Sequence, residues 1–320
     1  MAYRDTDFMY ASARVSAFET KLLTKEKYMQ IIDAATEKDA VALLGESVAP
    51  VAVDGAFDIE ATLEKFIADA FSEVAKSISE PKLFDFMRYE YDANNLKAAI
   101  KAHFIGADTD GMLFACGTLP PEAAEGAVQN GDFSAFPKHM AKAAAEALET
   151  YAATRDPQSV DLLIDRAAFA DMADGAAADT LLLDAVRARI DAINTVAAIR
   201  MIDAGKPDRI KPMLLAGGKI PLETFAASDR EALHAALAEK DAATANLLSD
   251  GNAALGDIER AVDKAATDRP EKAKFAPFGL PKLYAYLSAV QTQAKNLRII
   301  FALRAAHADK ETIRAKIRVN

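Results

Sequence analysis

The sequence predicts an all-α fold made of three pseudo-symmetric helical lobes of about 100 residues each. Three observations lead to this prediction. Apolar residues recur at helical spacing along nearly the whole chain, convincing strand patterns are absent, and one helical motif returns ninety-nine residues after its first appearance. Repetition at a long fixed period is typical of folds that use one supersecondary unit several times.

The repeated motif is a helix whose polar residues share one face. Its first copy runs from Asp85 to Gly106 and its second from Asp184 to Gly205, with a fainter third copy around Asn296. At about 100° per residue, these polar side chains form one stripe between two apolar flanks. The residues of this predicted polar stripe are Asp85, Arg88, Asp92, Asn95, Asp184, Arg187, Asp191, Asn194 and Asn296.

Two roles are open for the polar stripe. It could be a set of solvated salt-bridge ladders, each worth tenths of a kcal/mol. Repetition at one offset favours a structural role instead, such as fixing how each lobe meets the next. In both cases each carboxylate has an intrahelical arginine placed to neutralise it, and this favours structural ion pairs over paired active sites.

The other elements follow in order along the chain. Apolar residues from Ile59 to Ile78 are spaced at threes and fours, which predicts a buried helix ending before Pro81. The β-rich segment Val48–Val53 contains Pro50 and runs into Asp54-Gly55, so we predict a loop there. Further helices are predicted at residues 7–19, 138–155, 161–172, 180–203, 229–239 and 279–307.

Helix starts also repeat, and they set the predicted domain boundaries. Leu23-Thr24, Leu119-Pro120 and Ile220-Pro221 each precede a glutamate in the first turn. Thr24 is the expected N-cap, and the prolines suit the first helical position. These starts predict lobes at residues 21–118, 119–219 and 220–320, after an N-terminal helix within residues 1–20. We expect that helix to close onto the third lobe and complete a funnel or bowl.

Composition narrows the class of protein. The 320 residues are 51% hydrophobic and can bury a large core. A net charge of −10, from 38 basic and 48 acidic residues, argues against a nucleic-acid-binding protein. The single cysteine, Cys116, excludes an internal disulfide framework and is expected to be a buried apolar residue. No signal peptide is visible, and the uncharged run Leu283–Ala294 is too short to span a bilayer.

Motifs that carry chemistry are missing from the sequence. The four histidines, at positions 103, 139, 234 and 307, are too far apart to suggest a metal site. The acidic segment Asp108–Gly111 lacks most ligands of a calcium loop and is predicted to be a turn. The segment Gly217–Lys219 lacks the spacing of a phosphate-binding loop. We therefore expect no catalytic residue, no cofactor and no enzyme activity of the chain itself.

Several segments in this order resemble the C subunit of the archaeal and bacterial V/A-type ATP synthases, the counterpart of the d subunit in the eukaryotic vacuolar ATPase. The resemblance covers essentially the whole chain. The segments that carry it are Tyr10-Ala11-Ser12-Ala13-Arg14-Val15, Tyr91-Asp92-x-x-Asn95-Leu96-Lys97, Asp165-Arg166-Ala167-Ala168-Phe169 and Lys295-Asn296-Leu297-Arg298-Ile299-Ile300.

The resemblance implies a non-catalytic rotor protein shaped as an all-helical, three-lobed funnel. Such a protein sits on the cytoplasmic face of the membrane-embedded proteolipid (c/K) ring and receives the central axle, made of the D and F subunits. Its location would be cytoplasmic and peripheral to the membrane. This chain departs from the family pattern in its third repeat, where Gln293 replaces a glutamate, so the third stripe is expected to be neutral.

Partner-docking surfaces are expected at two places. The connectors Gly106–Gly117 and Gly205–Lys219 should lie together at one end of the bowl. A basic cluster with two aromatic residues is a second possibility, although such a cluster is more often a solvated loop. Its members are Lys272, Lys274, Phe275, Phe278 and Lys282.

Two other classes of function stay open. A free-standing helical repeat scaffold would bind a different protein partner in its concave face. An enzyme of unrecognised type ranks last, and a tightly bound small molecule would support it.

Overall fold

The computed structural model describes residues 4–45, 47–250, 253–262 and 276–318. Throughout these ranges the regular secondary structure is almost entirely helical, which confirms the predicted all-α fold. Contacts divide the chain into two compact units. Unit 1 combines Met1–Leu83 with Pro270–Asn320, and unit 2 is Phe84–Arg269. No helix within the described ranges is both long and apolar enough to cross a membrane.

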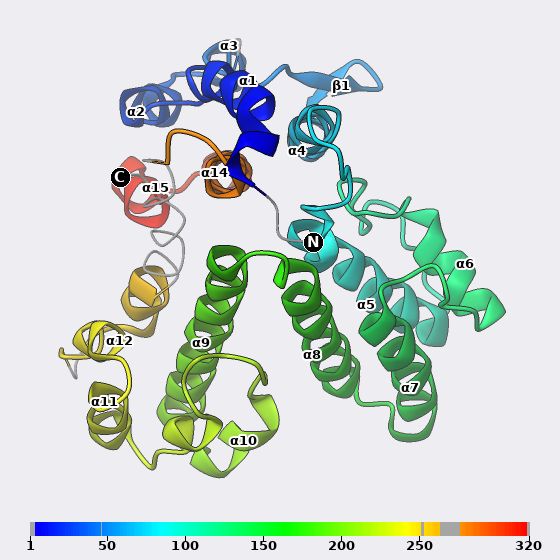
Figure 1. Ribbon diagram of the computed structural model, residues 1–320, viewed down its shortest axis with the longest axis vertical. Coiled ribbons are helices and arrows are strands. Elements are labelled where there is room, and N and C mark those ends of the chain that lie inside the picture. Colours follow the sequence, from blue (N-terminus) through cyan, green and yellow to red (C-terminus); the bar gives the residue numbers. More distant parts are fainter. Residues whose placement is uncertain (1–3, 46, 251–252, 263–275, 319–320) are drawn as a thin grey trace. The chain divides into compact units, whose positions relative to one another are not determined.

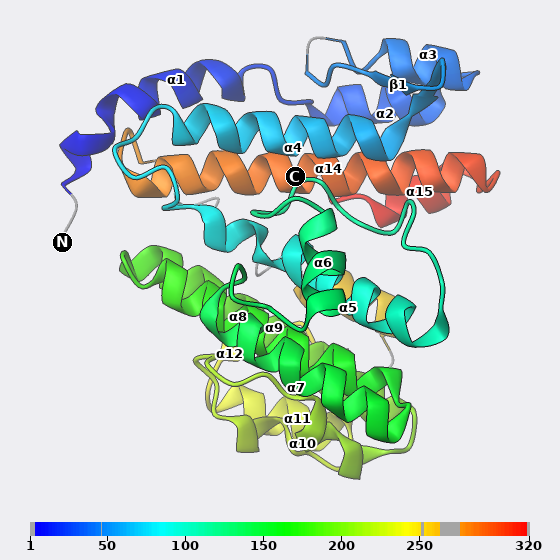
Figure 2. The same ribbon diagram turned by 90° about the vertical axis from the view of Figure 1, so that its right-hand side faces the viewer.

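Unit 1 is built around one long helix, α14 (Leu280–Ala305). Figure 1 shows α14 end-on, with neighbouring helices on several sides of it, and Figure 2 shows α4 running alongside. Leu283, Leu287, Val290 and Leu297 of α14 are fully buried, so its apolar residues supply the centre of this core. The other elements of unit 1 are η1 (Asp5–Phe8), α1 (Met9–Glu19), α2 (Lys25–Asp33), α3 (Glu37–Ala42), β1 (Val51–Val53), β2 (Ala56–Asp58), α4 (Ile59–Ala75) and α15 (Lys310–Lys316).

The N-terminal helix α1 packs on α14. The hydroxyl of Ser12 accepts a hydrogen bond from the N–H of Gly279 at 3.1 Å. Glu19 forms an ion pair with Lys282 of α14, with 2.5 Å between Oε2 and Nζ. Arg14 pairs with Glu73 of α4, so α1 is joined to both long helices of unit 1.

The predicted loop at Val48–Val53 is correct for residues 48–50 but wrong for Val51–Val53, because β1 and β2 form a short antiparallel hairpin. Asp54 and Gly55 make its turn, with φ of 52° and 82°. Two consecutive residues of positive φ match the twist of a two-residue hairpin, and Asp-Gly is a strong sequence signal for it. Pro50 lies just before β1 and therefore removes no hydrogen bond from the ladder.

Two hydrophobic cores lie among the described residues of unit 2. One joins α5 with the helices that follow it, from Ala93 to Ala168, and the other joins α9 with its following helices, from Ala198 to Val262. Helix α8 contacts α5, α7 and α9 (Figure 1). The elements are η2 (Asp85–Arg88), α5 (Tyr89–Ile105), α6 (Glu122–Asn130), α7 (Lys138–Thr154), α8 (Pro157–Ala176), α9 (Thr180–Asp203), η3 (Pro207–Arg209), α10 (Ile210–Met213), η4 (Leu222–Phe225), α11 (Arg230–Ala238), α12 (Ala242–Asn246) and a further helical stretch at 255–262.

The lobe boundaries expected from the sequence stay a prediction, although the cores of unit 2 are not confined within them. The first core of unit 2 crosses the expected boundary at 118/119, and the second crosses that at 219/220. Residues 220–320 are also divided between the two units. In both repeats of unit 2, the repeated helix buries apolar residues against the helices that follow its connector.

Helix boundaries agree closely with the sequence in most places. Helix α9 occupies the predicted range 180–203, and Thr24 caps α2 by accepting a hydrogen bond from the N–H of Lys27. Pro221 precedes a single 3-10 turn, and Pro120 lies two residues before α6, so neither proline occupies the first α-helical position.

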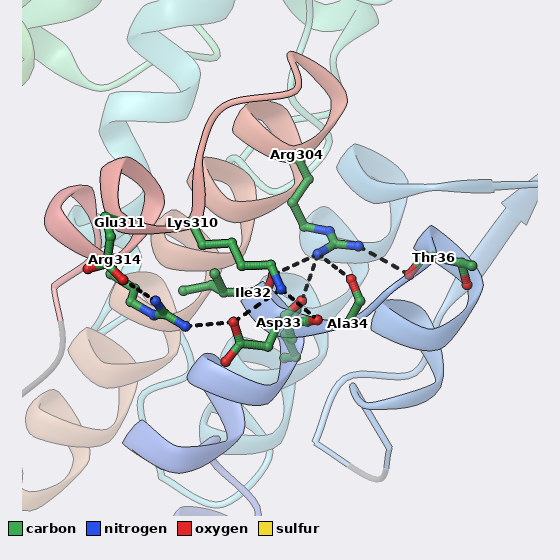
Figure 3. A network of polar contacts seen from close by, with 9 residues as sticks. Ile32, Asp33, Ala34, Thr36, Arg304, Lys310, Glu311 and Arg314 are labelled. Carbon is green, nitrogen blue, oxygen red and sulfur yellow. Dashed lines mark hydrogen bonds and ion pairs between the residues drawn. The ribbon is translucent and has the colours of Figure 1, made fainter.

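The end of α2 is held by an arginine of α14 (Figure 3). Arg304 Nη1 donates to the carbonyl oxygens of Ile31, Ile32 and Ala34 at 3.2, 2.8 and 3.0 Å, and Nη2 donates to that of Thr36 at 3.1 Å. The last carbonyl groups of a helix have no intrahelical partner. A guanidinium group supplies them with charge-assisted hydrogen bonds and complements the helix dipole.

Replacement of this arginine tests the contribution of the contact. Arg304→Ala should lower the free energy of unfolding by about 2 to 3 kcal/mol, because several carbonyl groups lose charged donors together. Arg200→Ala is the matched control, since the Arg200–Glu259 pair is largely exposed, and it should cost about 0 to 1 kcal/mol. Urea denaturation followed by circular dichroism measures both, and equal losses would contradict the capping role.

Candidate functional site: clamps on three repeated helices

The asparagine of each repeated helix binds the backbone of one residue in a later segment. Its Nδ2 donates to that residue's carbonyl oxygen, and its Oδ1 accepts from the same residue's N–H. We call this two-bond contact the asparagine clamp. The pairs are Asn95 with Phe114 (2.9 and 2.7 Å), Asn194 with Leu215 (2.9 and 2.8 Å) and Asn296 with Arg318 (2.8 and 2.8 Å).

A second contact, which we call the acceptor clamp, lies three residues earlier on the same helix face. Asp92 accepts from the N–H of Thr118 at 2.9 Å, from that of Leu119 at 3.2 Å and from the Thr118 hydroxyl at 2.5 Å. Asp92 is only 1% exposed, so these donors compensate for a carboxylate that water cannot reach.

The second repeat has an equivalent acceptor clamp. Asp191 accepts from the N–H groups of Lys219 at 2.9 Å and Ile220 at 3.2 Å, and it is 5% exposed. Ile220 and Leu119 are the aliphatic residues that mark the repeated helix starts. Each carboxylate thus fixes the point at which the connector ends and the following helices begin.

An intrahelical arginine pairs with Asp85, as expected. Asp92 and Asp191, the carboxylates of the acceptor clamps, are bound mainly at the ends of the connectors. Arg88 pairs with Asp85 at 3.0 Å and donates from Nη1 to the carbonyl oxygen of Gly117 at 2.9 Å. In the second repeat Asp184 pairs with Lys219 at 2.8 Å, and Arg187 is exposed. Backbone N–H groups donate to both Asp92 and Asp191, and the Thr118 hydroxyl also donates to Asp92. A buried connector must satisfy its own backbone polar groups, and the carboxylates do this.

The close approach of carboxylate and connector requires glycine. A Cβ atom on Gly117 would lie 2.3 Å from Asp92 Oδ1, and one on Gly218 would lie 2.0 Å from Asp191 Oδ1. Neither glycine has a positive φ, so space and not backbone conformation excludes a side chain. The need for glycine at these positions is visible in the sequence, because both glycines stand at the same distance before the repeated prolines.

In the third repeat, a neutral glutamine takes the position that the aspartate of the acceptor clamp has in the first two repeats. Gln293 lies three residues before Asn296, accepts from the N–H of Leu23 at 2.8 Å and donates to the Ser47 hydroxyl at 2.9 Å. Leu23 corresponds to Leu119 and Ile220 in the repeated helix starts. The neutral side chain therefore binds the equivalent backbone group, and the two clamps of α14 hold segments far apart in sequence.

Another buried carboxylate, Asp171, lies outside the predicted polar stripe. From α8 it accepts the N–H groups of His139 at 2.9 Å and Met140 at 2.8 Å, and thereby caps the N-terminus of α7. Burial raises the pKa of Asp171, against the effect of these hydrogen bonds. Its partners are about thirty residues away on another helix, so no local sequence signal could have identified it.

The aromatic basic cluster is described only in part. Lys272, Lys274 and Phe275 lie outside the described residues. Phe278 is 39% exposed, whereas Lys282 is only 9% exposed because its ammonium group pairs with Glu19. Lys282 therefore offers no exposed charge to a partner. Cys116 is fully buried, as expected for an apolar residue.

The glycines can be tested with a control inside the chain. Gly117→Ala and Gly218→Ala should each lower the free energy of unfolding by about 2 to 4 kcal/mol, because the new methyl group displaces a hydrogen-bonded buried carboxylate. Gly126 lies within α6 with nothing near its Cβ position, so Gly126→Ala should be neutral or stabilise by up to about 1 kcal/mol. Denaturant titration distinguishes these outcomes, and a neutral Gly117→Ala would contradict the close approach.

The pH dependence of stability tests the buried state of Asp92. Burial raises its pKa, and the hydrogen bonds from Thr118 and Leu119 oppose the shift only in part. The folded chain then binds more protons than the unfolded chain at pH values just above the ordinary aspartate pKa, so stability falls as pH rises through that window. Relative to the wild type, Asp92→Asn should gain stability over the same rise in pH.

A second aspartate provides the control of opposite sign. Hydrogen bonding to Arg230 lowers the pKa of Asp203, so its contribution to stability is present above the ordinary pKa and is lost as pH falls. Relative to the wild type, Asp203→Asn should lose stability as pH rises from acid. Thermal or urea unfolding across the acid range measures both slopes, and slopes of the same sign would contradict this assignment.

Comparison with known proteins gives consistent matches along the chain. The model of the ATP synthase (C/AC39) subunit family matches residues 11–316. The A-type ATP synthase C subunit of Thermococcus onnurineus is 24% identical over 338 residues, covering 95% of this chain and 88% of that protein. The V-type sodium ATPase C subunit of Enterococcus hirae is 22% identical over 316 residues, covering 94% of each.

A third relative, the A-type ATP synthase C subunit of Thermococcus kodakarensis, is 22% identical and covers 98% of this chain and 90% of its own length. Because the family model spans nearly the whole chain, this protein belongs to the ATP synthase (C/AC39) subunit family, whose members are accessory and not catalytic subunits of A/V-type ATP synthases.

Proposed function

We propose that this chain is a central-stalk subunit of a V/A-type rotary ATP synthase or ATPase, which links the D and F subunits of the axle to the membrane proteolipid ring. It takes no part in the chemistry of ATP and transmits torque between the two. The observation that carries this proposal is the family match over residues 11–316, together with relatives that are named as C subunits and align along most of their own length.

The clamps support a mechanical role. A part that transmits torque must resist deformation between its two contact surfaces, and loops are the usual weak points of a helical protein. Here the connectors that follow α5 and α9 are each held at two points by buried side chains. Breaking such a contact leaves polar groups unsatisfied in the interior, which opposes shear of the connector against its helix.

Attachment to the membrane is proposed to occur through the proteolipid ring, on its cytoplasmic side. None of the helices in the described ranges is long and apolar enough to cross the bilayer, which agrees with attachment through a partner. A stand-alone repeat scaffold would share the same clamps, and only the identity of its partners would distinguish it.

The test is a pull-down from solubilised native membranes with the tagged full chain as bait and the bound proteins identified by mass. Recovery of both axle subunits together with the proteolipid is the expected result. Circular dichroism of the bait confirms that it is folded, and the tag alone serves as control. A folded bait that retains neither axle nor ring would contradict the rotor function.

A further inference from the structure

The connectors held by equivalent clamps carry different charges. The first connector, residues 106–117, contains two exposed aspartates, Asp108 and Asp110, and no lysine or arginine. The second connector, residues 205–219, contains exposed Lys206, Arg209 and Lys211 against one aspartate near them in sequence. Equivalent positions of the repeat therefore present opposite charge.

The third clamped segment, residues 306–318, is basic in sequence but partly neutralised inside unit 1. Lys310 Nζ lies 3.4 Å from Asp33 Oδ1, and Arg314 Nη2 lies 2.6 Å from the same oxygen (Figure 3). Arg314 also pairs with Glu311. Much of the positive charge of this segment thus serves the contact with α2.

In the part of the chain that the structure describes, three basic side chains of the second connector have no ion-pair partner. Among the described residues, no ion pair involves Lys206, Arg209 or Lys211, whereas Lys219 pairs with Asp184. Arg166 of α8 adds a further guanidinium at this place, since its Nη2 donates to the carbonyl oxygen of Pro212 at 2.5 Å. Four exposed basic residues thus lie on or beside the second connector of a chain whose net charge is −10, and we call Lys206, Arg209, Lys211 and Arg166 the basic cluster.

The backbone under the basic cluster is firmly held. The N–H of Lys206 donates to the carbonyl oxygen of Met201 at 2.8 Å, Ile210 is fully buried, and Leu215 is bound by the asparagine clamp. The short helices η3 and α10 lie within this segment (Figure 2). Charges on an ordered backbone lose less conformational freedom on binding, which favours a specific contact.

We propose that the basic cluster of Lys206, Arg209, Lys211 and Arg166 is a docking surface for a carboxylate-rich face of another subunit of the complex. This inference rests on the proposed function and adds which part of the chain binds an acidic partner. Opposite charge guides association and excludes partners of the wrong sign. The acidic first connector would repel the same face, so one orientation of the partner is selected.

A protein face fits this surface better than a lipid bilayer does. The large apolar side chains that are exposed in the described residues include none between 205 and 219, so the connector has nothing to insert among acyl chains.

The experiment compares two triple variants of equal charge in the same pull-down. Lys206→Gln/Arg209→Gln/Lys211→Gln removes the basic cluster apart from Arg166. Lys25→Gln/Lys27→Gln/Lys38→Gln removes three exposed lysines of α2 and α3 that make no ion pair in the described ranges. Each full-length variant is used as bait at about 0.1 M and about 1 M salt, and the axle and proteolipid subunits are quantified separately.

We expect the cluster variant to retain about tenfold less of one identified subunit at low salt, with the control variant equal to the wild type. The difference should shrink at high salt, where charges are screened within about 3 Å. Equal retention by both variants would overturn the docking surface while leaving the rotor function intact. Failure of the wild-type bait to retain any subunit would instead contradict the rotor function.

A vesicle measurement separates protein from lipid. Binding of wild type and cluster variant to phosphatidylserine vesicles and to phosphatidylcholine vesicles should be equally weak. Loss of phosphatidylserine binding in the cluster variant, with subunit retention unchanged, would assign the basic cluster to the membrane and overturn the proposal.

Discussion

The structure depends on one constraint, which is that a polar backbone segment can lie against a buried helix face only if its N–H and carbonyl groups are satisfied there. The asparagine clamp meets this constraint with one side chain, because an amide both donates and accepts. Asn95, Asn194 and Asn296 use it in the same way, two of them in unit 2 and one in unit 1. The clamp thereby fixes the position of the bound backbone segment relative to the repeated helix.

The acceptor clamp shows how far the chemistry can change while the geometry persists. A carboxylate binds two N–H groups at Asp92 and at Asp191, whereas the neutral Gln293 binds the single N–H of Leu23 and donates its amide N–H to Ser47. Neutral and charged acceptors are thus interchangeable at this position. Asymmetry between the repeats arises on their surfaces instead, where one connector is acidic and its equivalent is basic.

Sequence periodicity predicted the helical class and most helix ranges, because these depend on local spacing. It also placed five of the clamp residues on one helix face, although it did not predict that they bind the connectors. The i,i+4 spacing of Arg88 and Asp92 is visible in sequence, and while burial raises the pKa of Asp92, the charge of Arg88 does act to lower it. The hydrogen-bond donors at Thr118 and Leu119 are not visible in sequence, because they lie beyond the helix. The same limit hid Asp171, whose partners lie on another helix. The hairpin has a local turn signal at Asp54-Gly55, but Pro50 directly before β1 interrupts the strand pattern in the sequence.

Native-state hydrogen exchange of the clamped amides tests the central claim most directly. The N–H groups of Phe114, Leu215 and Arg318 lie outside helices, and loop amides ordinarily exchange fast. If the asparagine clamps hold the connectors, these amides should exchange as slowly as helical amides of their own unit, and Asn194→Ala should release Leu215 while leaving Phe114 protected. Exchange of all three at the rate of the unclamped loop residue Gly111 would contradict the account.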